Sequence, residues 1–310
     1  TGVQTCALPI SKLMKRKDLL SEMQNPLSME IDSLPVGEIL TIINSEDQKI
    51  AKAIQSIIPE IETTVNLAVK ALQAGGHIFY IGAGTSGRLG VLDASEIPPT
   101  FSAPHEWFQG IIAGGEEALV RSIEGAEDSS EDAIQDLKKC HFSKHDLLVG
   151  ISCSGSAKYV VSALDYARSL GAFTAYLVTN KAPYRATKTD VLMAVNIGPE
   201  VVTGSTRMKA GTATKLILNM ISTATMIRMG KTLGNLMVDL QVVNEKLLDR
   251  GRRIISEITG FEAKKSEKLL RESGMSVKTA IVMGLMQCSA KDAIAKLEKN
   301  EGFLRRVLSE

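Results

Sequence analysis

Aromatic residues, cysteines and excess charge of either sign are scarce in this 310-residue chain. It has one tryptophan, four cysteines and a net charge of +1, from 36 Lys and Arg against 35 Asp and Glu. This balance argues against nucleic-acid binding, because such proteins need a basic excess to displace counterions. Four cysteines without a C-x-x-C pair indicate neither a disulfide scaffold nor a zinc module, and they suit the reducing cytoplasm.

Long hydrophobic runs are also missing. No stretch of about 18 uncharged apolar residues occurs, so the sequence predicts no membrane-spanning helix and no membrane partner. The first ten residues, TGVQTCALPI, lack an initiator methionine and resemble a translated sequencing adapter. We therefore expect residues 1–13 to be non-native, with Met14 as the candidate natural start.

Short apolar runs alternate with helical stretches through the middle of the chain. Fully apolar strands separated by helices are typical of a parallel sheet covered on both faces, which predicts an α/β fold with a parallel five-stranded sheet. The predicted strands are 78–81, 110–113, 147–151, 172–178 and 191–197. The predicted helices in and around the sheet are 36–74 (one or two helices, broken near Pro59), 116–123, 130–139, 157–170, 210–229 and 237–248.

Changes in composition divide the natural chain into three parts. Residues 14–74 read as an arm followed by helices, and residues 75–250 as the sheet domain. Residues 251–310 contain short charged helical pieces separated by Gly and Ser, which predict a small all-helical module.

Three turns rich in glycine and hydroxyl residues accompany the predicted strands and open predicted helices. Backbone N–H groups at a helix start, together with hydroxyl donors, suit a phosphate monoester. One such turn is commonly only a helix cap, but three near strand ends favour a sugar-phosphate site. The candidate binding residues are Thr85 and Ser86 in the first turn, Ser154 and Ser156 in the second, and Ser205 and Lys209 in the third.

The first turn, 81–90, formally matches the dinucleotide pattern G-x-G-x-x-G. That pattern also needs an acidic residue about 20 positions later, at the end of the second strand. Here the second strand ends near Ala113, too far along the chain, so no nucleotide cofactor is expected. Cys140, His141 and His145 have no further ligand nearby and favour a solvated helix end over a metal site, so no metal is expected.

Two acidic segments are candidates for acid–base catalysis. Glu96 lies in DASEIPP, where Pro98 and Pro99 predict a forced helix end close to the first turn. Glu124 and Glu127 lie in EGAED, after the second strand. Two carboxylates beside one pocket could serve as general acid and general base, whereas the ordinary state of a glutamate is simply solvated. Spacing alone leaves both interpretations open.

Longer strings resemble a known family. GAGTSGRLG, LDASEIPPT, EGAED, GPEVVTGSTRMKAGTATKLILNM and GNLMVDLQVVNEKL are similar to the N-acetylmuramic acid 6-phosphate etherases. These belong to the sugar isomerase (SIS) domain superfamily and are related to glucokinase regulatory protein. The resemblance runs from about Asn25 to the C-terminus. It implies a flavodoxin-like SIS domain with a helical tail, acting as a homodimer on a small sugar phosphate without metal or nucleotide.

The resemblance also implies a reaction and its residues. Family members cleave the D-lactyl ether of N-acetylmuramic acid 6-phosphate, giving N-acetylglucosamine 6-phosphate and D-lactate. Glu96 matches the family's acid, and Glu127, rather than Glu124, its second catalytic glutamate. Ser86 and Ser154 match phosphate contacts of SIS domains.

These residues fit the chemistry of an elimination. The open-chain sugar has an acidic C2 proton, which Glu127 would remove while Glu96 protonates the lactate oxygen at C3, before water adds back at C3. Arg207 or Lys209 is expected to hold the enolate-like charge or the lactate carboxylate.

The second turn departs from the family. Many etherases carry SGRTPY where this chain has SGSAKY, so a threonine hydroxyl is missing at Ala157. Ser156 or Lys158 is expected to replace it. Two alternatives stay open: a non-catalytic sugar-phosphate sensor like the regulatory protein, and an aldose–ketose isomerase, the commonest SIS chemistry.

Overall fold

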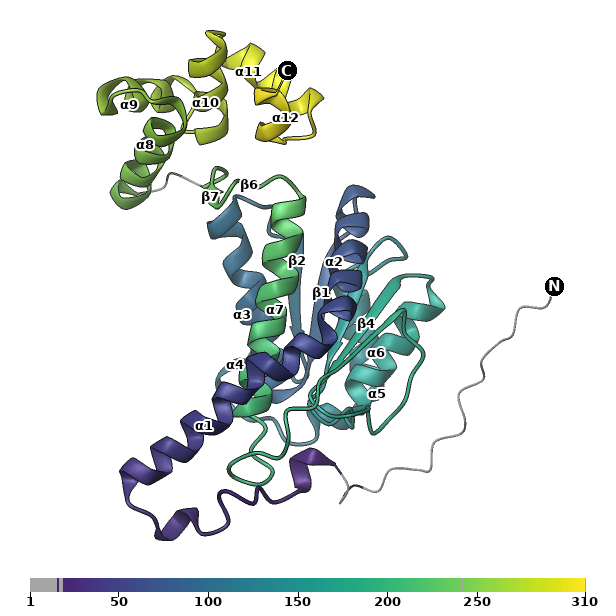
Figure 1. Ribbon diagram of the computed structural model, residues 1–310. Helices are drawn as coiled ribbons and strands as arrows, with labels where there is room; N and C mark the ends of the chain where they lie inside the picture. Colours follow the sequence, from purple (N-terminus) through teal and green to yellow (C-terminus); the bar gives the residue numbers. More distant parts are fainter. Residues whose placement is uncertain (1–15, 17–18, 241, 243, 310) are drawn as a thin grey trace, which may run out of the picture.

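A parallel sheet of five strands, in the order β2-β1-β3-β4-β5, forms the centre of the protein (Figure 1). The computed structural model describes residues 16, 19–240, 242 and 244–309, so the expectation for residues 1–13 lies outside it. The strand order is that of flavodoxin, and it confirms the predicted sheet. The strands are β1 (Ile78–Gly82), β2 (Phe108–Ile112), β3 (Leu147–Ile151), β4 (Phe173–Val178) and β5 (Val191–Ala194).

Helices cover both faces of the sheet. One core lies between the sheet and helices α2, α3 and α7, and the other between the sheet and α5 and α6. Alternate side chains of β1 enter the two cores, which is why its sequence is apolar throughout. The helices are α2 (Ile58–Gln73), α3 (Gly84–Phe101), α5 (Ser130–Lys139), α6 (Lys158–Ser169) and α7 (Lys209–Arg228).

An arm and a long helix precede the sheet. From Leu19 onward the arm contains the short 3-10 helices Leu20–Glu22 and Ile31–Ser33, and α1 (Val36–Ile54) then projects its first half beyond the sheet (Figure 1). A 3-10 turn, Gln55–Ile57, separates α1 from α2. Pro59 occupies the first turn of α2, where its missing N–H has no helical partner to lose.

The C-terminal helices pack around a core of their own. They follow a two-stranded hairpin that leaves the end of α7 (Figure 1). The hairpin strands are β6 (Thr232–Leu233) and β7 (Leu236–Met237). The helices are α8 (Glu245–Thr259), α9 (Ala263–Glu272), α10 (Val277–Met286), α11 (Ala290–Lys299) and α12 (Leu304–Leu308).

Three details differ from the predicted elements. The helix predicted at 237–248 is wrong, because β7 ends at Met237 and α8 begins only at Glu245; likewise, the helix predicted at 116–123 shrinks to α4 (Glu117–Val120). The boundary placed between residues 250 and 251 falls inside α8. A Cβ at Gly251 would sit 3.2 Å from side-chain atoms of Leu270 and Val277, so this glycine lets α9 and α10 pack closely against α8.

Within the described part of the chain, no helix is long and apolar enough to span a membrane.

Candidate functional site

A cavity of about 500 Å³ opens where β1 and β3 end. Strands β2 and β3 lie on opposite sides of β1 within the sheet, so the strand order reverses here. This is the topological switch point at which such sheets bind ligands. The wall combines the first two turns, the loop after β2, two residues of the arm and two of the third turn. A cavity of this volume suits a small-molecule ligand.

The first turn supplies hydroxyl and N–H donors. Thr85 and Ser86 both line the cavity, and no side chain caps the start of α3. The first N–H groups of a helix have no partner within the helix, so they are open to an anion here. Gly87 permits this geometry, because a Cβ there would come within 2.6 Å of Ile112 Cγ1 and 2.7 Å of the Gly82 carbonyl oxygen.

The second turn supplies a similar set of donors. Ser154 and Ser156 line the cavity with their hydroxyl oxygens 2.8 Å apart. Gly155 between them has φ +71°, and a Cβ there would lie 2.6 Å from Pro183, so the turn requires glycine. Ala157 is the N-cap of α6 and makes no side-chain hydrogen bond, which leaves a second helix start uncapped beside the first.

Of the two expected substitutes for the missing threonine hydroxyl, only Ser156 reaches the cavity wall. Lys158 points its ammonium toward Asp128, 3.7 Å away, and is absent from the residues that line the cavity. Cys153 lies between the two turns, with Sγ 3.5 Å from Ser86 Oγ. Burial raises the pKa of the Cys153 thiol, so this side chain adds no negative charge beside the proposed phosphate position.

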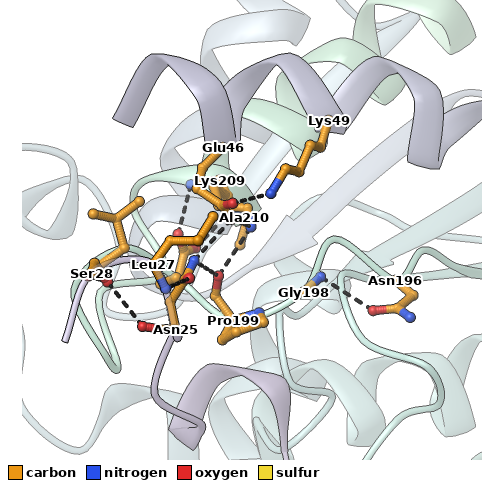
Figure 2. A network of polar contacts seen from close by, with 12 residues as sticks. Asn25, Leu27, Ser28, Glu46, Lys49, Asn196, Gly198, Pro199, Lys209 and Ala210 are labelled. Atoms are coloured by element: carbon orange, nitrogen blue, oxygen red, sulfur yellow. Dashed lines mark hydrogen bonds and ion pairs between the residues drawn. The ribbon is translucent and has the colours of Figure 1, made fainter. Parts of the chain in front are cut away.

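The two candidate residues of the third turn lie outside the cavity wall. Lys209 is 1% exposed, and its Nζ donates to Glu46 Oε2 at 2.6 Å and to the Pro199 carbonyl at 3.0 Å (Figure 2). Its ammonium is therefore occupied away from the cavity, and the expectation that it binds phosphate is corrected. Ser205 is also outside the cavity wall, which instead contains its neighbours Gly204 and Thr206.

The start of α7 already holds an anion of the protein itself. The Glu200 carboxylate accepts the N–H groups of Lys209 and Ala210, each at 2.9 Å. Burial raises the pKa of Glu200 against these two hydrogen bonds and the charge of Lys209. Because this carboxylate caps α7, the starts of α3 and α6 are the uncapped ones among the three helices that follow these turns in the described part of the chain. The sequence signal that would have revealed this was the glutamate of GPE, nine residues before the helix.

The pKa of Glu46 is shifted in the opposite direction from that of Glu200. Burial alone would raise the pKa of its carboxyl, but hydrogen bonds from Lys209, Lys49 and Asn25 outweigh burial and lower the pKa from 4.5 to about 2. Glu46, Lys209 and Asn25 are each less than 5% exposed, so the contacts among them are shielded from solvent, whereas the Lys49 side chain is exposed.

This shift predicts a pH dependence of stability. A carboxyl whose pKa falls on folding contributes stability that is complete above its unfolded value and lost as the pH falls toward its folded value. We expect Glu46→Gln to lower the free energy of unfolding most at neutral pH, and the difference from the wild type to shrink between about pH 5 and pH 2. Urea unfolding at several pH values measures it; a difference that stays constant over that range would contradict the assignment.

The loop after β2 brings carboxylates to the cavity. Glu124 and Glu127 both line it, and both are exposed. Arg88 holds this loop: its Nε donates to the Leu119 carbonyl at 3.0 Å and its Nη2 to the Arg121 carbonyl at 2.9 Å. The sequence reasoning missed Arg88, although it lies in the first glycine-rich turn. Arg88 and Arg121 both line the cavity.

Glu96 lies apart from this cavity. Helix α3 continues through Pro98 and Pro99 to Phe101, so the predicted helix end before the prolines is wrong. Glu96 is exposed and comes twelve residues after Gly84, which places it about 18 Å along the helix from the first turn. It does not line the cavity of its own chain.

The remaining predictions concern Arg207 and the expected absence of a metal or cofactor. Arg207 is exposed and lies outside the cavity wall. Among the described residues, no three or more His, Cys, Asp or Glu side chains gather as a metal site would require. That the protein works without metal or cofactor stays a prediction.

Comparison with known proteins identifies relatives over nearly the whole chain. The family model described as glucokinase regulatory protein N-terminal SIS domain matches residues 56–168. N-acetylmuramic acid 6-phosphate etherase of Clostridium beijerinckii is 45% identical over 95% of this chain and 97% of its own. The protein of that name in Klebsiella aerogenes is 48% identical over 94% of this chain and 97% of its own, and that of Exiguobacterium sp. is 48% identical over 94% and 99%.

Among solved structures, phosphoheptose isomerase GmhA from Neisseria gonorrhoeae is similar at a TM-score of 0.47 and 16% identity, over 62% of this chain and 98% of its own. The sequence relatives are far closer and cover both the sheet domain and the C-terminal helices. The chain belongs to the N-acetylmuramic acid 6-phosphate etherase family.

Proposed function

We propose that this chain cleaves the D-lactyl ether of N-acetylmuramic acid 6-phosphate, giving N-acetylglucosamine 6-phosphate and D-lactate. The observation that carries the proposal is the set of relatives bearing that name at 45–48% identity over more than nine-tenths of the chain. The cavity supports it, because two uncapped helix starts and the hydroxyls of Ser86 and Ser154 can surround a phosphate monoester.

The proposed reaction is an elimination followed by an addition. Glu127 removes the C2 proton of the open-chain sugar, the C3–O bond breaks, and an acid protonates the oxygen of the departing lactate. Water then adds across the double bond, returning a hydroxyl to C3 and a proton to C2. The guanidinium groups of Arg88 and Arg121, rather than Lys209, are the cations in the cavity wall for the lactate carboxylate.

Glu96 fits the role of the acid only if it comes from a second copy of the chain. It lies about 18 Å along α3 from the proposed phosphate position, farther than one hexose can span. A homodimer in which α3 of one copy reaches the cavity of the other would supply it. Apolar side chains left exposed on α1, α3 and α7 support such a partner: Val36, Leu40, Leu92, Met220 and Ile227 are 41–71% exposed.

The cytoplasm is the proposed compartment. Cys140, Cys153 and Cys288 are all free thiols in the described residues, and such thiols persist best under reducing conditions.

The test is incubation of the purified chain with N-acetylmuramic acid 6-phosphate and an enzymatic assay for D-lactate. We expect D-lactate and, in deuterated water, a sugar product that carries deuterium at C2. Tight binding without lactate at high enzyme concentration would indicate a sensor instead. Conversion of an unsubstituted hexose phosphate to its ketose, without action on the ether, would indicate an isomerase. Lactate without C2 deuterium would overturn the elimination.

A further inference from the structure

The buried charges behind the third turn connect three segments that are far apart in the sequence. Glu46 lies on α1, Lys209 begins α7, and Asn25 belongs to the arm; each is less than 5% exposed. Asn25 Nδ2 donates to Glu46 Oε2 at 2.9 Å and to the Pro199 carbonyl at 3.3 Å (Figure 2). Lys209 Nζ donates to the same two groups. The carboxylate of Glu46 and the carbonyl of Pro199 thus each accept a hydrogen bond from Asn25 and another from Lys209.

The same segments form one wall of the cavity. Ser21 and Glu22 of the arm line it, as do Gly204 and Thr206 of the loop that follows Pro199. Arm and loop are joined at the wall itself, where the Gly204 N–H donates to the Ser21 carbonyl at 2.8 Å. A second hydrogen bond joins the arm and the loop: Ser28 Oγ donates to the Val201 carbonyl at 2.7 Å. The charged cluster joins the same two segments, because Asn25 of the arm and Lys209 both donate to the carbonyl of Pro199, where the loop begins.

Stability alone does not account for the ion pair. Removing two charges from water is costly, and a buried pair can often be replaced by apolar side chains of similar size without loss of stability. What an apolar pair lacks is direction: it cannot fix a carbonyl oxygen and a carboxylate at set distances. The Lys209 ammonium does this for Pro199, at the start of the loop that reaches the cavity.

We propose that Lys209 and Glu46 are positioning residues, which hold residues 20–28 of the arm and the loop of residues 199–206 as a fixed wall of the sugar-phosphate cavity. They touch no substrate. This inference rests on the function proposed above, and it gives the conspicuous STRMKAG segment a role other than ligand binding.

The test compares single and double apolar variants. Lys209→Met leaves Glu46 buried without its partner, so it lowers the thermal midpoint strongly. The double variant Glu46→Met with Lys209→Met removes both charges and recovers most of that loss. If the pair positions the wall, KM for the ether stays roughly ten- to a hundredfold above the wild-type value in the double variant, while kcat changes little.

A matched control is available in the C-terminal helices. Lys278 is also buried, and its Nζ donates to Asp239 Oδ2 at 2.7 Å and to the Gly302 carbonyl at 2.8 Å, the same kind of contacts that Lys209 makes. Lys278→Met is therefore expected to lower the thermal midpoint without changing KM. A double variant whose KM returns to the wild-type value along with its stability would overturn the proposal.

Two further measurements cover other outcomes. If the double variant does not fold, Ser28→Ala removes one bond between arm and loop without burying a charge, and a several-fold rise in KM is expected. Calorimetric binding of N-acetylglucosamine 6-phosphate repeats the comparison without catalysis. Unchanged affinity in Ser28→Ala and in the double variant would contradict the positioning role. Wild-type binding without D-lactate release would count against the proposed function alone.

Discussion

Glu127→Gln is expected to lower kcat/KM by roughly 10²- to 10⁴-fold, the usual contribution of a general acid or base. Glutamine keeps the size of the side chain and can still donate a hydrogen bond, but it cannot accept the C2 proton. The variant should therefore lose D-lactate release and, in deuterated water, also lose exchange at C2 of the sugar. Steady-state assays and mass spectrometry of the recovered sugar measure the two effects.

Glu124→Gln is the matched control for this prediction. Glu124 lies three residues earlier in the same loop and also lines the cavity, so its replacement removes the same charge from the same wall. We expect it to retain most of the activity and the C2 exchange. A chain in which Glu124→Gln is inactive while Glu127→Gln is active would reverse the assignment that the family resemblance suggested.

Glu96→Gln is expected to be as inactive as Glu127→Gln, yet a mixture of the two should recover activity. In a two-fold dimer whose sites each combine Glu127 of one copy with Glu96 of the other, a mixed dimer has one complete site. Random exchange of subunits makes half of the dimers mixed, so an equimolar mixture should reach about a quarter of wild-type activity. Assays before and after denaturing and refolding the mixture measure the recovery.

The control replaces one partner by the double variant Glu96→Gln with Glu127→Gln. Mixed with the single variant Glu127→Gln, it leaves no Glu127 in any dimer, so no activity should return. If Glu96→Gln alone is fully active, Glu96 is not the acid. If the first mixture stays inactive although size-exclusion chromatography detects dimers, the two glutamates do not serve one site from different copies.

The sequence alone predicted the parts of the site that are local. The strands lie between two cores and are largely apolar, so they stand out from the helices around them. Within each of the first two turns, the donors are separated by only one or two positions and follow a strand directly. Their neighbourhood in space follows from the order of the chain.

Long-range pairing could not be predicted in this way. A lysine in a glycine- and hydroxyl-rich turn is typical of a phosphate ligand, and nothing beside Lys209 indicates Glu46, 163 residues earlier. One indirect signal existed on α1. Glu46 is spaced with Ile50 and Ile54 on the buried side of that helix, where a charge requires a partner.

The misplacement of Glu96 has a different physical origin. Two prolines remove two N–H donors and crowd the preceding turn, so a helix end was expected there. In α3 they lie in the final turn, close to the helix end at Phe101, and Ser102 follows in a left-handed conformation. Glu96 precedes both prolines, so it is the twelve helical residues between Gly84 and Glu96 that place it about 18 Å from the first turn.

Helix α3 has a consequence for how two such sites would behave together. Its first turn lines the cavity of its own chain, and Glu96 lies near its far end. In the proposed dimer, each α3 would thus belong to two active sites, and its length would set the spacing between the two bound sugars. A displacement of one α3 upon phosphate binding would shift the acid of the neighbouring site. Substrate binding to one copy would then change the catalytic rate of the other.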